Sequence, residues 1–543
     1  MIRPDYNEIE RFAKEYGVIP VCREIYADIT TPIAILRRIS QTSDRYFLLE
    51  SIEGGEKWGR YSFLGCDPLV RITCINGEIK IEDGAKKVQK SRIQKSRIQK
   101  SRKPYEALRT FLSRYRAPAL EGMPPFAGGL VGYFSYSMIG YAEDVLKLRN
   151  SGFHDFDLML YDKVIAYDHL KQKISIVVNI RTDKIQENYQ KAIADIEDII
   201  CMISSQAVSA ASEAGDAQAE SAASEAGGAQ AESAASETGD AQTVSAESPR
   251  ERVQSEAPVP EARSVPRFTC NVTKDEYCSM VEKAKENIRN GDIFQAVISR
   301  RFETEYRESL LNAYRVLRTT NPSPYMVCMK NEDVQLISAS PETLVRLHNG
   351  ILSTFPIAGS RPRGQNTPED QALEKELLED GKELAEHNML VDLARNDLGK
   401  ISKCQSVQVA KYKTIQRYSR IMHITSEVEG LIREDMDALD AIEALLPAGT
   451  LSGAPKIRAC EIIEELEKEP RGIYGGAIGY IDFTGNMDVC IAIRMAVKKG
   501  DRVYVQAGGG IVADSVPEKE YEESEHKARA VMEAIITARE VEG

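Results

Sequence analysis

The chain has 543 residues, of which 42% are hydrophobic and 28% are charged, and its formal net charge at pH 7 is −13. At about 150 residues per domain, this length allows two to four soluble globular domains. The acidic balance argues against nucleic acid as the main partner. No apolar run approaches the ~18 residues of a membrane span, the charged N-terminal segment lacks the apolar stretch of a signal peptide, and ten cysteines without a C-x-x-C pair suit reduced thiols. We therefore expect a cytoplasmic protein with no membrane segment.

Residues 1–206 are predicted to form an N-terminal block of strands with helices between them. Apolar and polar residues alternate in short segments at hairpin-like spacing, which favours antiparallel pairing. A basic repeat, QKSRIQKSRIQKSRK, lies in an insert over residues 86–103 that holds nine Lys or Arg and no acidic residue. We interpret this insert as an expanded surface loop. The predicted strands of the block are 45–52, 60–65, 69–75, 128–136, 157–169 and 173–180.

Residues 207–265 are predicted to be a disordered acidic linker. A 12-residue unit, SAASEAGDAQAE, recurs there three times with small changes, and the segment holds eleven Asp or Glu against three Lys or Arg. Aromatic and branched apolar residues are nearly absent, so the segment has too little apolar surface to offset the entropy of ordering. The repeat is also too polar for a solenoid unit.

Residues 266–543 are predicted to form a C-terminal block that mixes helices with strand hairpins. This mixture indicates an α+β fold rather than a doubly wound parallel sheet. The helix over 368–397 is expected to start at a Thr367 cap followed by Pro368. The predicted helices are 274–290, 368–397, 435–446, 455–466 and 517–540, and the predicted strands are 292–303, 325–330, 336–347, 475–483, 489–499 and 502–508.

Two pairs of glutamates are the most informative feature of this block. Glu383 and Glu386 lie three residues apart, as do Glu520 and Glu523, so each pair projects from nearly one face of a helix. The apolar neighbours of the first pair predict that its carboxylates face inward. Buried carboxylates need a cation, and such a set suits a hard ion such as Mg²⁺. The alternative is a solvated face, with Glu523 and Lys527 as an i, i+4 salt bridge.

Two glycine-rich segments are candidates for turns or for anion binding. GTLSGAPK over 449–456 departs from a phosphate-binding loop, because Ala-Pro precedes its lysine and no Ser or Thr follows, so we predict a tight turn with the Thr450 hydroxyl available. QAGGGIV over 506–512 places three glycines after a predicted strand. There, backbone N–H groups could approach an anion, or the glycines could form a plain turn or bulge.

Three single residues are also candidates. His423 alternates with apolar neighbours on a probable strand, as a core histidine does, or as a general base or acid would. Arg494 stands in an otherwise apolar predicted strand, which implies a buried acid or an anionic ligand as its partner. Tyr474 precedes two glycines, where its phenol would face a pocket or pack in the core.

Taken together, the motifs of the chain resemble the chorismate-utilising enzyme family. They occur in the family's order and cover nearly the whole chain outside the two low-complexity segments. The resemblance implies two facing antiparallel sheets with helices outside, built from both blocks. The motifs are LLESIEGGEKWGRYSFLG, GGLVGYFSY, NPSPYM, SASPETLVR, PIAGSRPRG, AEHNMLVDLARNDLG, GTLSGAPK, YGGAIGY and QAGGGIVADSVPEKEYEE.

The resemblance is strongest to the family's anthranilate-forming branch, which implies a lyase at the first committed step of tryptophan biosynthesis. Relatives that activate water carry a lysine where this chain has Gln295, so ammonia is the implied nucleophile. Aminodeoxychorismate synthases carry PIKGT, whose lysine attacks the ring, where this chain has PIAGS with Ala358. The implied reaction turns chorismate and ammonia into anthranilate and pyruvate. The alternatives are an aminodeoxychorismate or aminodeoxyisochorismate synthase subunit or, from another class, a catalytically silent, ligand-sensing partner.

The resemblance also implies roles for individual residues. Glu386 and Glu523 would bind Mg²⁺, supported by Glu383 and Glu520. Glu342 would protonate the departing hydroxyl, and His423 and Thr450 would lie beside the reacting ring. Chorismate would be held by Gly359, Ser360 (where the family has threonine), Tyr474, Arg494, Gly508, Gly509 and Gly510.

Two partners follow from the resemblance. No Gly-x-Cys-x-Gly amidotransferase motif occurs in the chain, so a separate glutamine amidotransferase subunit, component II, would supply ammonia from glutamine. Two segments, 49–51 and 321–326, resemble the family's feedback site for L-tryptophan, and both could instead be packing segments. The implied tryptophan-binding residues are Ser51, Pro324, Tyr325 and Met326.

Overall fold

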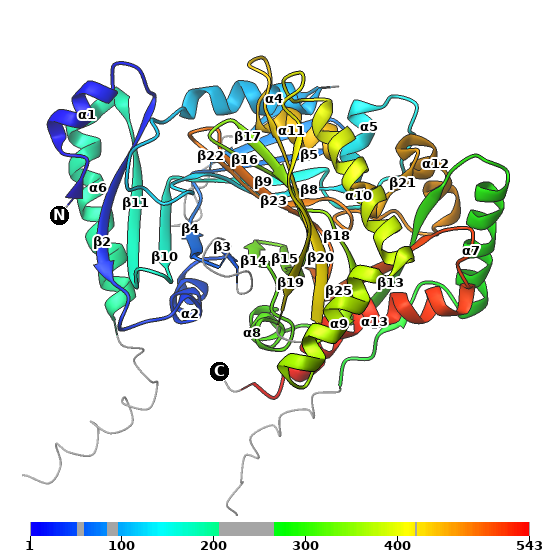
Figure 1. Ribbon diagram of the computed structural model, residues 1–543. Coiled ribbons are helices and arrows are strands. Elements are labelled where there is room, and N and C mark those ends of the chain that lie inside the picture. Colours follow the sequence, from blue (N-terminus) through cyan, green and yellow to red (C-terminus); the bar gives the residue numbers. More distant parts are fainter. Residues whose placement is uncertain are drawn as a thin grey trace, which may run out of the picture. The chain divides into compact units, whose positions relative to one another are not determined.

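The structure is a computed structural model that describes residues 2–51, 59–83, 96–101, 103–205, 265–418 and 421–541 (Figure 1). Residues 1–204 and 266–543 make one compact unit, so the N- and C-terminal blocks belong to the same body. The predicted acidic linker and most of the predicted basic insert lie outside the described residues. Residues 96–100 of the insert form a strand at the edge of a sheet, so the interpretation as a surface loop was wrong for them. Among the described helices, none is long and apolar enough to cross a membrane.

The compact unit is built on two large sheets. The first, of 13 strands, has the order β1 (Ile2–Arg3), β2 (Val18–Tyr26), β11 (Lys173–Arg181), β10 (Lys163–Asp168), β4 (Tyr61–Cys66), β3 (Arg45–Glu50), β14 (Tyr325–Asn331), β15 (Val334–Ser340), β24 (Met495–Lys499), β25 (Arg502–Ile511), β13 (Gln295–Glu305) and β12 (Thr269–Cys270), with β21 (Gly453–Ala454) paired to β13. The second, of 12 strands, has the order β18 (Ile357–Pro362), β20 (Ile421–Leu431), β17 (Ile351–Thr354), β16 (Thr343–His348), β23 (Met487–Ile491), β22 (Ala477–Asp482), β8 (Gly129–Phe134), β9 (Phe156–Tyr161), β5 (Val70–Ile75), β6 (Glu78–Asp83) and β7 (Ser96–Lys100), with β19 (Gln408–Arg417) paired to β20.

Both blocks contribute to both sheets. In the first sheet they join where β3 pairs antiparallel with β14, and in the second where β8 pairs antiparallel with β22. The sheets face each other across an apolar core in which Phe47 and Val327 of the first sheet pack with Val131 and Ile478 of the second. The predicted α+β fold with two facing antiparallel sheets is therefore confirmed.

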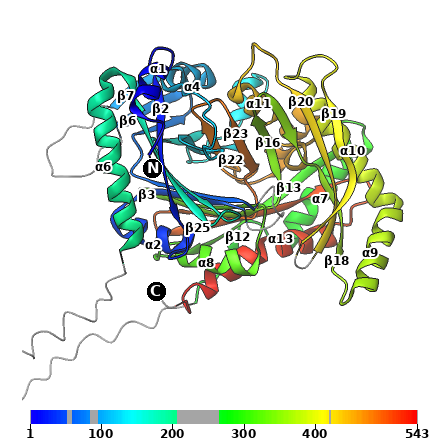
Figure 2. The ribbon, with the colours of Figure 1, turned by 60° about the vertical axis from the view of Figure 1, so that its left-hand side comes forward.

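Helices cover the outer faces of the two sheets (Figures 1 and 2). Helix α6 packs on β11, α13 packs on β25, and α10 packs on β18 and β20. Helices α6 and α13 contribute to one large core cluster, through Ile196 and Val531 among others. Helix α10 contributes Val391 and Leu398 to another. The helices are α1 (Tyr6–Phe12), α2 (Pro32–Thr42), α4 (Pro104–Leu112), α5 (Ile139–Ala142), α6 (Ile185–Ser204), α7 (Lys274–Arg289), α8 (Leu311–Thr320), α9 (Thr367–Glu379), α10 (Gly381–Gly399), α11 (Ala438–Leu445), α12 (Lys456–Leu466) and α13 (Pro517–Thr537).

The prediction of one helix over 368–397 was wrong. The structure has two helices, α9 and α10, separated by Asp380 in an extended conformation. The Asp380 carboxylate accepts hydrogen bonds from the backbone N–H groups of Lys382 and Glu383, so it caps α10 instead of continuing α9. The cap of α9 is Asn366 and not Thr367.

Three predicted strands were each wrong in the same way. The run 157–169 is β9 and β10, 336–347 is β15 and β16, and 489–499 is β23 and β24, and in each case the two strands belong to different sheets. At the third break Arg494 has a φ of 50°, a left-handed value that a regular strand excludes. Glu342 and Arg494 therefore lie in segments that connect the two sheets.

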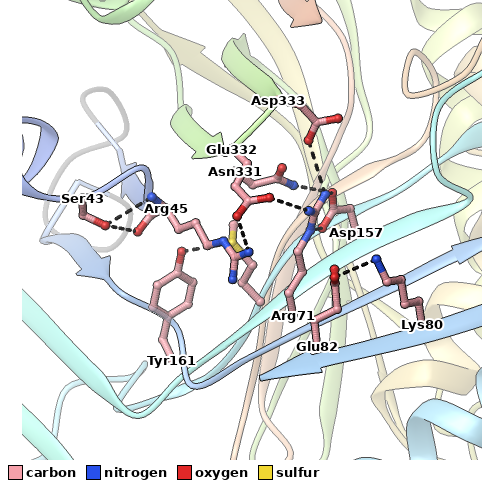
Figure 3. Close-up of polar contacts among 11 residues, drawn as sticks. Ser43, Arg45, Arg71, Lys80, Glu82, Asp157, Tyr161, Asn331, Glu332 and Asp333 are labelled. Carbon is pink, nitrogen blue, oxygen red and sulfur yellow. Dashed lines mark hydrogen bonds and ion pairs between the residues drawn. The ribbon is translucent and has the colours of Figure 1, made fainter. Parts of the chain in front are cut away.

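A buried polar network joins the two blocks (Figure 3). Arg71 of β5 donates two hydrogen bonds, of 3.0 and 2.7 Å, to the Asp157 carboxylate of β9, and these side chains are 6% and 0% exposed. Asn331, at the end of β14, also donates to Asp157. Nearby, Arg45 of β3 forms an ion pair of 2.6 Å with Glu332. The β14–β15 turn is thereby bonded to strands of the N-terminal block.

We expect Arg71→Met to lower the free energy of unfolding by about 3–5 kcal/mol, because it leaves the buried Asp157 carboxylate without the guanidinium and, among the described residues, with only His154 and Asn331 as partners. Urea unfolding followed by circular dichroism measures this loss. The matched control is Arg395→Met, whose partner Asp392 lies on the surface with 71% of its side chain exposed. The control should lose no more than about 1 kcal/mol. Equal losses in the two variants would contradict the importance of the buried pair.

Candidate active site

The two glutamate pairs lie close enough to act on each other. Burial raises the pKa of Glu386, and the charges of Glu383 on its own helix and of Glu523 on α13 raise it further. Burial also raises the pKa of Glu520, with a further contribution from Glu523. Helices α10 and α13 therefore bring four carboxylates into one acidic site.

The expectation that these carboxylates face inward was only partly right. Glu383 and Glu520 are half-buried, whereas Glu523 and much of Glu386 are exposed, so the desolvation of the Glu386 carboxylate is only partial. Glu523 forms a 2.7 Å ion pair with Lys527. Across the described residues, no three His, Cys, Asp or Glu side chains are grouped closely enough to hold a metal ion. The arrangement suits an ion that needs few protein ligands, and Mg²⁺ commonly takes one or two carboxylates and keeps several waters.

Arg300 of β13 fixes the orientation of α13. Its side chain is 1% exposed, its Nε donates to the Ser524 hydroxyl and its Nη2 donates to the Tyr521 carbonyl, each at 2.8 Å. The guanidinium carbon also lies 3.7 Å from the centroid of the Tyr521 ring. These contacts hold the turn of α13 that carries Glu520 and Glu523.

The three glycines Gly508–Gly510 lie within β25 and not after it, so the alternative of a plain turn or bulge was wrong. A Cβ on Gly509 would come within 2.8 Å of a Glu520 carboxylate oxygen, and one on Gly510 would collide with the Gln295 amide. The strand therefore passes directly against the acidic site and against Gln295, and the glycines leave room for both side chains.

Arg494 and Lys527 place two cations beside these glycines. Arg494 donates to the Lys527 carbonyl at 3.0 Å, and Lys527 Nζ donates to the Gly508 carbonyl at 3.1 Å. Within the described chain no carboxylate lies within ion-pair distance of the Arg494 guanidinium, whose pKa is lowered by burial. The sequence-based alternative of a buried acid partner is therefore absent, and the guanidinium is available to an anionic ligand.

Tyr474 and Lys527 complete this side of the site. Tyr474 is buried, and burial raises the pKa of its phenol to about 12 despite the opposing charges of Arg471 and Arg494. The phenol therefore stays a hydrogen-bond donor at neutral pH. Sequence reasoning missed Lys527 as a site residue, although its position four residues after Glu523 places both on one face of α13.

His423 of β20 lies opposite Ser360 of β18 in the second sheet. Its Nδ1 is 3.2 Å from the carbonyl oxygen of Gly359. A carbonyl only accepts, so Nδ1 carries the hydrogen and Nε2 keeps its lone pair. Burial lowers the pKa of His423, so the imidazole is neutral at neutral pH. Gly359 has a φ of 77°, and a Cβ at this position would lie 3.2 Å from a carboxylate oxygen of Glu383. Strand β18 therefore lies directly against the acidic site. The next residue, Ser360, is exposed.

Glu342 lies in the segment that connects β15 with β16. The hydroxyl of Thr450, in the short 3₁₀ helix η4 (Gly449–Leu451), donates to it at 3.0 Å. Both residues line a small cavity of about 50 Å³ together with Leu393, Asp397 and other largely apolar neighbours. Burial raises the pKa of Glu342 to about 7, against the lowering effects of the Thr450 hydrogen bond and the charge of Lys527. The carboxyl can therefore donate a proton near neutral pH.

The two segments predicted to bind tryptophan are neighbours. Strand β3 pairs with β14 so that Glu50 lies opposite Met326, which places Ser51 beside Pro324 and Tyr325. The Glu50 carboxylate is 5% exposed and accepts hydrogen bonds of 2.6 Å from each of two α8 side chains, the Tyr314 hydroxyl and Arg318 Nε. The Tyr325 hydroxyl donates to Asp488 at 2.8 Å.

The fold and the clustered residues define a chorismate-binding enzyme. The model of that family, described as chorismate binding enzyme, matches residues 52–533, and the chain belongs to this family. The particular relatives agree with one another. The chain is 42% identical to anthranilate synthase component 1 of Acetivibrio thermocellus, with all of both chains covered, and 41% identical to that of Aquifex aeolicus, with 98% of each covered.

Solved structures agree with the fold. Anthranilate synthase component I from Streptococcus pneumoniae superimposes with a TM-score of 0.67 and 32% identity, covering 94% of this chain and 99% of that one. The menaquinone-specific isochorismate synthase of Escherichia coli superimposes with a TM-score of 0.62 at 16% identity, covering 98% of each chain. The second match shows the shared fold alone. The family resemblance that the motifs predicted is thus confirmed.

Proposed function

We propose that the chain is a synthase subunit that converts chorismate and ammonia to anthranilate, pyruvate and water, at the first committed step of tryptophan biosynthesis. The observation that carries this proposal is the full-length identity of about 40% with relatives named anthranilate synthase component 1. The geometry is compatible with it: the charge of Lys527 acts on a carboxyl with a pKa of about 7, and the charge of Arg494 acts on a neutral histidine.

The positively charged side chains of the site bind the substrate. Chorismate carries two carboxylates, and Arg494, Lys527 and the backbone around Gly508 offer donors for an anion. Tyr474 keeps its phenolic proton and can add a further hydrogen bond. Ser360 supplies a hydroxyl at the edge of the acidic site.

Glu342 donates a proton in the reaction, and His423 accepts one. Attack of ammonia on the ring expels a hydroxyl, and Glu342, oriented by Thr450, gives that hydroxyl its proton so that it leaves as water. Formation of the aromatic ring then requires loss of a ring proton as the pyruvyl ether departs. The neutral imidazole of His423, with its free Nε2, is the group suited to accept that proton.

The residues fit Mg²⁺, with Glu386 and Glu523 as ligands and Glu383 and Glu520 in support. Burial raises the pKa of Glu386, and the negative charges of Glu383 and Glu523 raise it further, as expected where carboxylates gather around a cation site. When bound, the ion neutralises the acidic site and a substrate carboxylate. A set of ligands that are all oxygen atoms favours Mg²⁺ over softer metal ions.

We assign the supply of ammonia to a partner protein. The relatives' name, component 1, implies a second component, which we assign as a glutamine amidotransferase subunit, component II. Ammonium salts should replace that partner in vitro, because the synthase chemistry needs ammonia alone.

The test is a product assay with chorismate, ammonium and Mg²⁺, read by fluorescence and mass spectrometry. Anthranilate and pyruvate are expected. Accumulation of aminodeoxychorismate or aminodeoxyisochorismate, or no turnover, would overturn the proposal. Ala358 stands where aminodeoxychorismate synthases carry the ring-attacking lysine, and Gln295 stands where relatives that activate water carry theirs, whereas aminodeoxyisochorismate formation is decided by the product assay alone.

Regulation by L-tryptophan is part of the proposal, with the ligand placed beside Ser51 and residues 324–326, at the end of β3 and the start of β14. Ser51→Phe should fill that space and raise the tryptophan concentration for half-inhibition by at least about tenfold, because a bulky ring excludes the ligand. Turnover without tryptophan should stay near that of the parent enzyme. Inhibition curves measure the effect, with Ser113→Phe on the exposed helix η1 (Ser113–Tyr115) as the control.

Because coupling is reciprocal, chorismate should also weaken tryptophan binding in the parent protein, which calorimetry with and without chorismate can measure. Tryptophan affinity unaffected by both chorismate and Ser51→Phe would refute the assigned pocket.

A further inference from the structure

Arg471 is a buried arginine without a role in the reaction described above. It lies between α12 and β22, and its side chain is 2% exposed. Its guanidinium pairs with Glu467, whose side chain is 4% exposed: Nε lies 2.9 Å from Oε2, and Nη2 lies 2.6 Å from Oε1. Desolvation of such a pair is costly unless further hydrogen bonds satisfy both groups.

The further hydrogen bonds reach two other elements. Arg471 Nη1 donates to the carbonyl of Leu451 in η4, and Nη2 donates to the carbonyl of Val297 in β13 at 2.6 Å. Glu467 Oε1 accepts from both the backbone N–H and the hydroxyl of Ser299, each at 2.8 Å. The pair therefore connects the end of α12 with η4 and with β13.

Two neighbours of this ion pair belong to the candidate active site. Leu451 directly follows Thr450, whose hydroxyl donates to Glu342. The guanidinium carbon of Arg471 also lies 5.8 Å from the ring centroid of Tyr474. Arg471 itself does not line the cavity beside Glu342, so it acts on the site through these neighbours.

We propose that Arg471 is a positioning residue, which together with Glu467 holds the carbonyl of Leu451 and the ring of Tyr474 and so sets the hydrogen bond from Thr450 to Glu342. A lysine in its place keeps a cation beside Glu467 but lacks the planar fork that bonds three partners at once. The η4 turn then loses its anchor, and the hydrogen bond from Thr450 weakens.

This inference predicts a direction that a loss of stability alone does not. The hydrogen bond from Thr450 lowers the pKa of Glu342, so its loss raises that pKa. Lys527, whose charge also lowers that pKa, and Asp397, which lines the same cavity, both stay in place. A proton donor with a higher pKa remains protonated to higher pH, so the basic limb of the pH profile moves upward.

The test compares Arg471→Lys with Thr450→Val and with Arg71→Lys. For Arg471→Lys we expect kcat with ammonia to fall by on the order of tenfold, because the proton donor is misplaced, and the basic limb to move to higher pH, as in Thr450→Val. Arg71→Lys, at the equally buried pair in Figure 3, should lose thermal stability but keep the parent's pH profile. The inference would be overturned if the basic limb of the pH profile of folded Arg471→Lys coincided with that of the parent, or if the basic limb of Arg71→Lys moved to higher pH as well.

A second measurement needs no turnover. Infrared titration of the Glu342 carboxyl, identified by its loss in Glu342→Gln, should show the same upward shift in Arg471→Lys. If Arg471→Lys does not fold, Glu467→Gln, which replaces the ion pair by a neutral hydrogen bond, should shift the titration in the same direction, and an unmoved titration there refutes the inference. The assay rests on the proposed function, but the titration does not. A parent protein without anthranilate synthesis therefore refutes the function, and the titration alone decides the role of Arg471.

Discussion

Glu386→Gln and Glu523→Gln should each reduce ammonia-dependent anthranilate formation by at least about a hundredfold while the protein stays folded. The two carboxylates come from different helices, and burial together with the charges of Glu383 and Glu523 raises the pKa of Glu386, although Lys382 and Lys527 oppose this shift. Removing either charge removes one ligand of the proposed Mg²⁺ ion. Calorimetric titration with Mg²⁺ should show weaker binding in both variants.

The matched control for this pair of variants is Glu522→Gln. Glu522 neighbours Glu523 on α13 and is exposed to solvent, so its substitution changes the net charge of the helix equally. We expect its turnover and Mg²⁺ affinity to match those of the parent. Parent-like turnover with unchanged Mg²⁺ dependence in both Glu386→Gln and Glu523→Gln would refute the metal assignment.

Glu342→Gln should lower kcat by a factor of about 10²–10⁴, the usual contribution of a positioned general acid. The parent has a carboxyl with a pKa of about 7, so its kcat, expressed per concentration of free ammonia, should decline as the pH rises above about 7. Glutamine cannot donate a carboxyl proton, so the residual activity of the variant should show no such limb. Steady-state rates between pH 5.5 and 9 measure both effects.

The same substitution has a signature in stability. Burial raises the pKa of Glu342 from 4.5 to about 7 on folding, so between these values the unfolded chain releases a proton that the folded protein keeps. The parent therefore loses stability as the pH rises through this window, by up to about 3 kcal/mol, and the effect is constant below and above it. Urea unfolding of Glu342→Gln should lack this loss. Equal pH dependence of stability in parent and variant would contradict the raised pKa.

Local sequence pattern determined much of the secondary structure. The helices predicted over 274–290, 455–466 and 517–540 are present as α7, α12 and α13 with ends shifted by a few residues. The i, i+3 spacing places each glutamate pair on one side of its helix, as expected. These predictions succeed because a helix or strand buries residues at intervals set by its own backbone. The ordered motifs likewise sufficed to predict the family.

Tertiary structure alone decided where an apolar run changes sheets. The runs 157–169, 336–347 and 489–499 look continuous, because a strand that ends in one sheet and restarts in the other keeps its apolar character. The breaks place Glu342 and Arg494 in connections between sheets. At Asp380 the deciding contact was a cap to its own backbone neighbours, which competed successfully with continuation of the helix.

Tertiary structure also decided which polar residues support the site. Arg300 bonds to Ser524, 224 positions away, and Arg471 bonds to carbonyls in two other elements. Sequence pattern indicated the carboxylates, the histidine and Arg494 because each stands out against its immediate neighbours. The partners of Arg300, Arg471 and Lys527 come together only on folding, and the free energy of a buried charge depends on those partners and not on its neighbours along the chain.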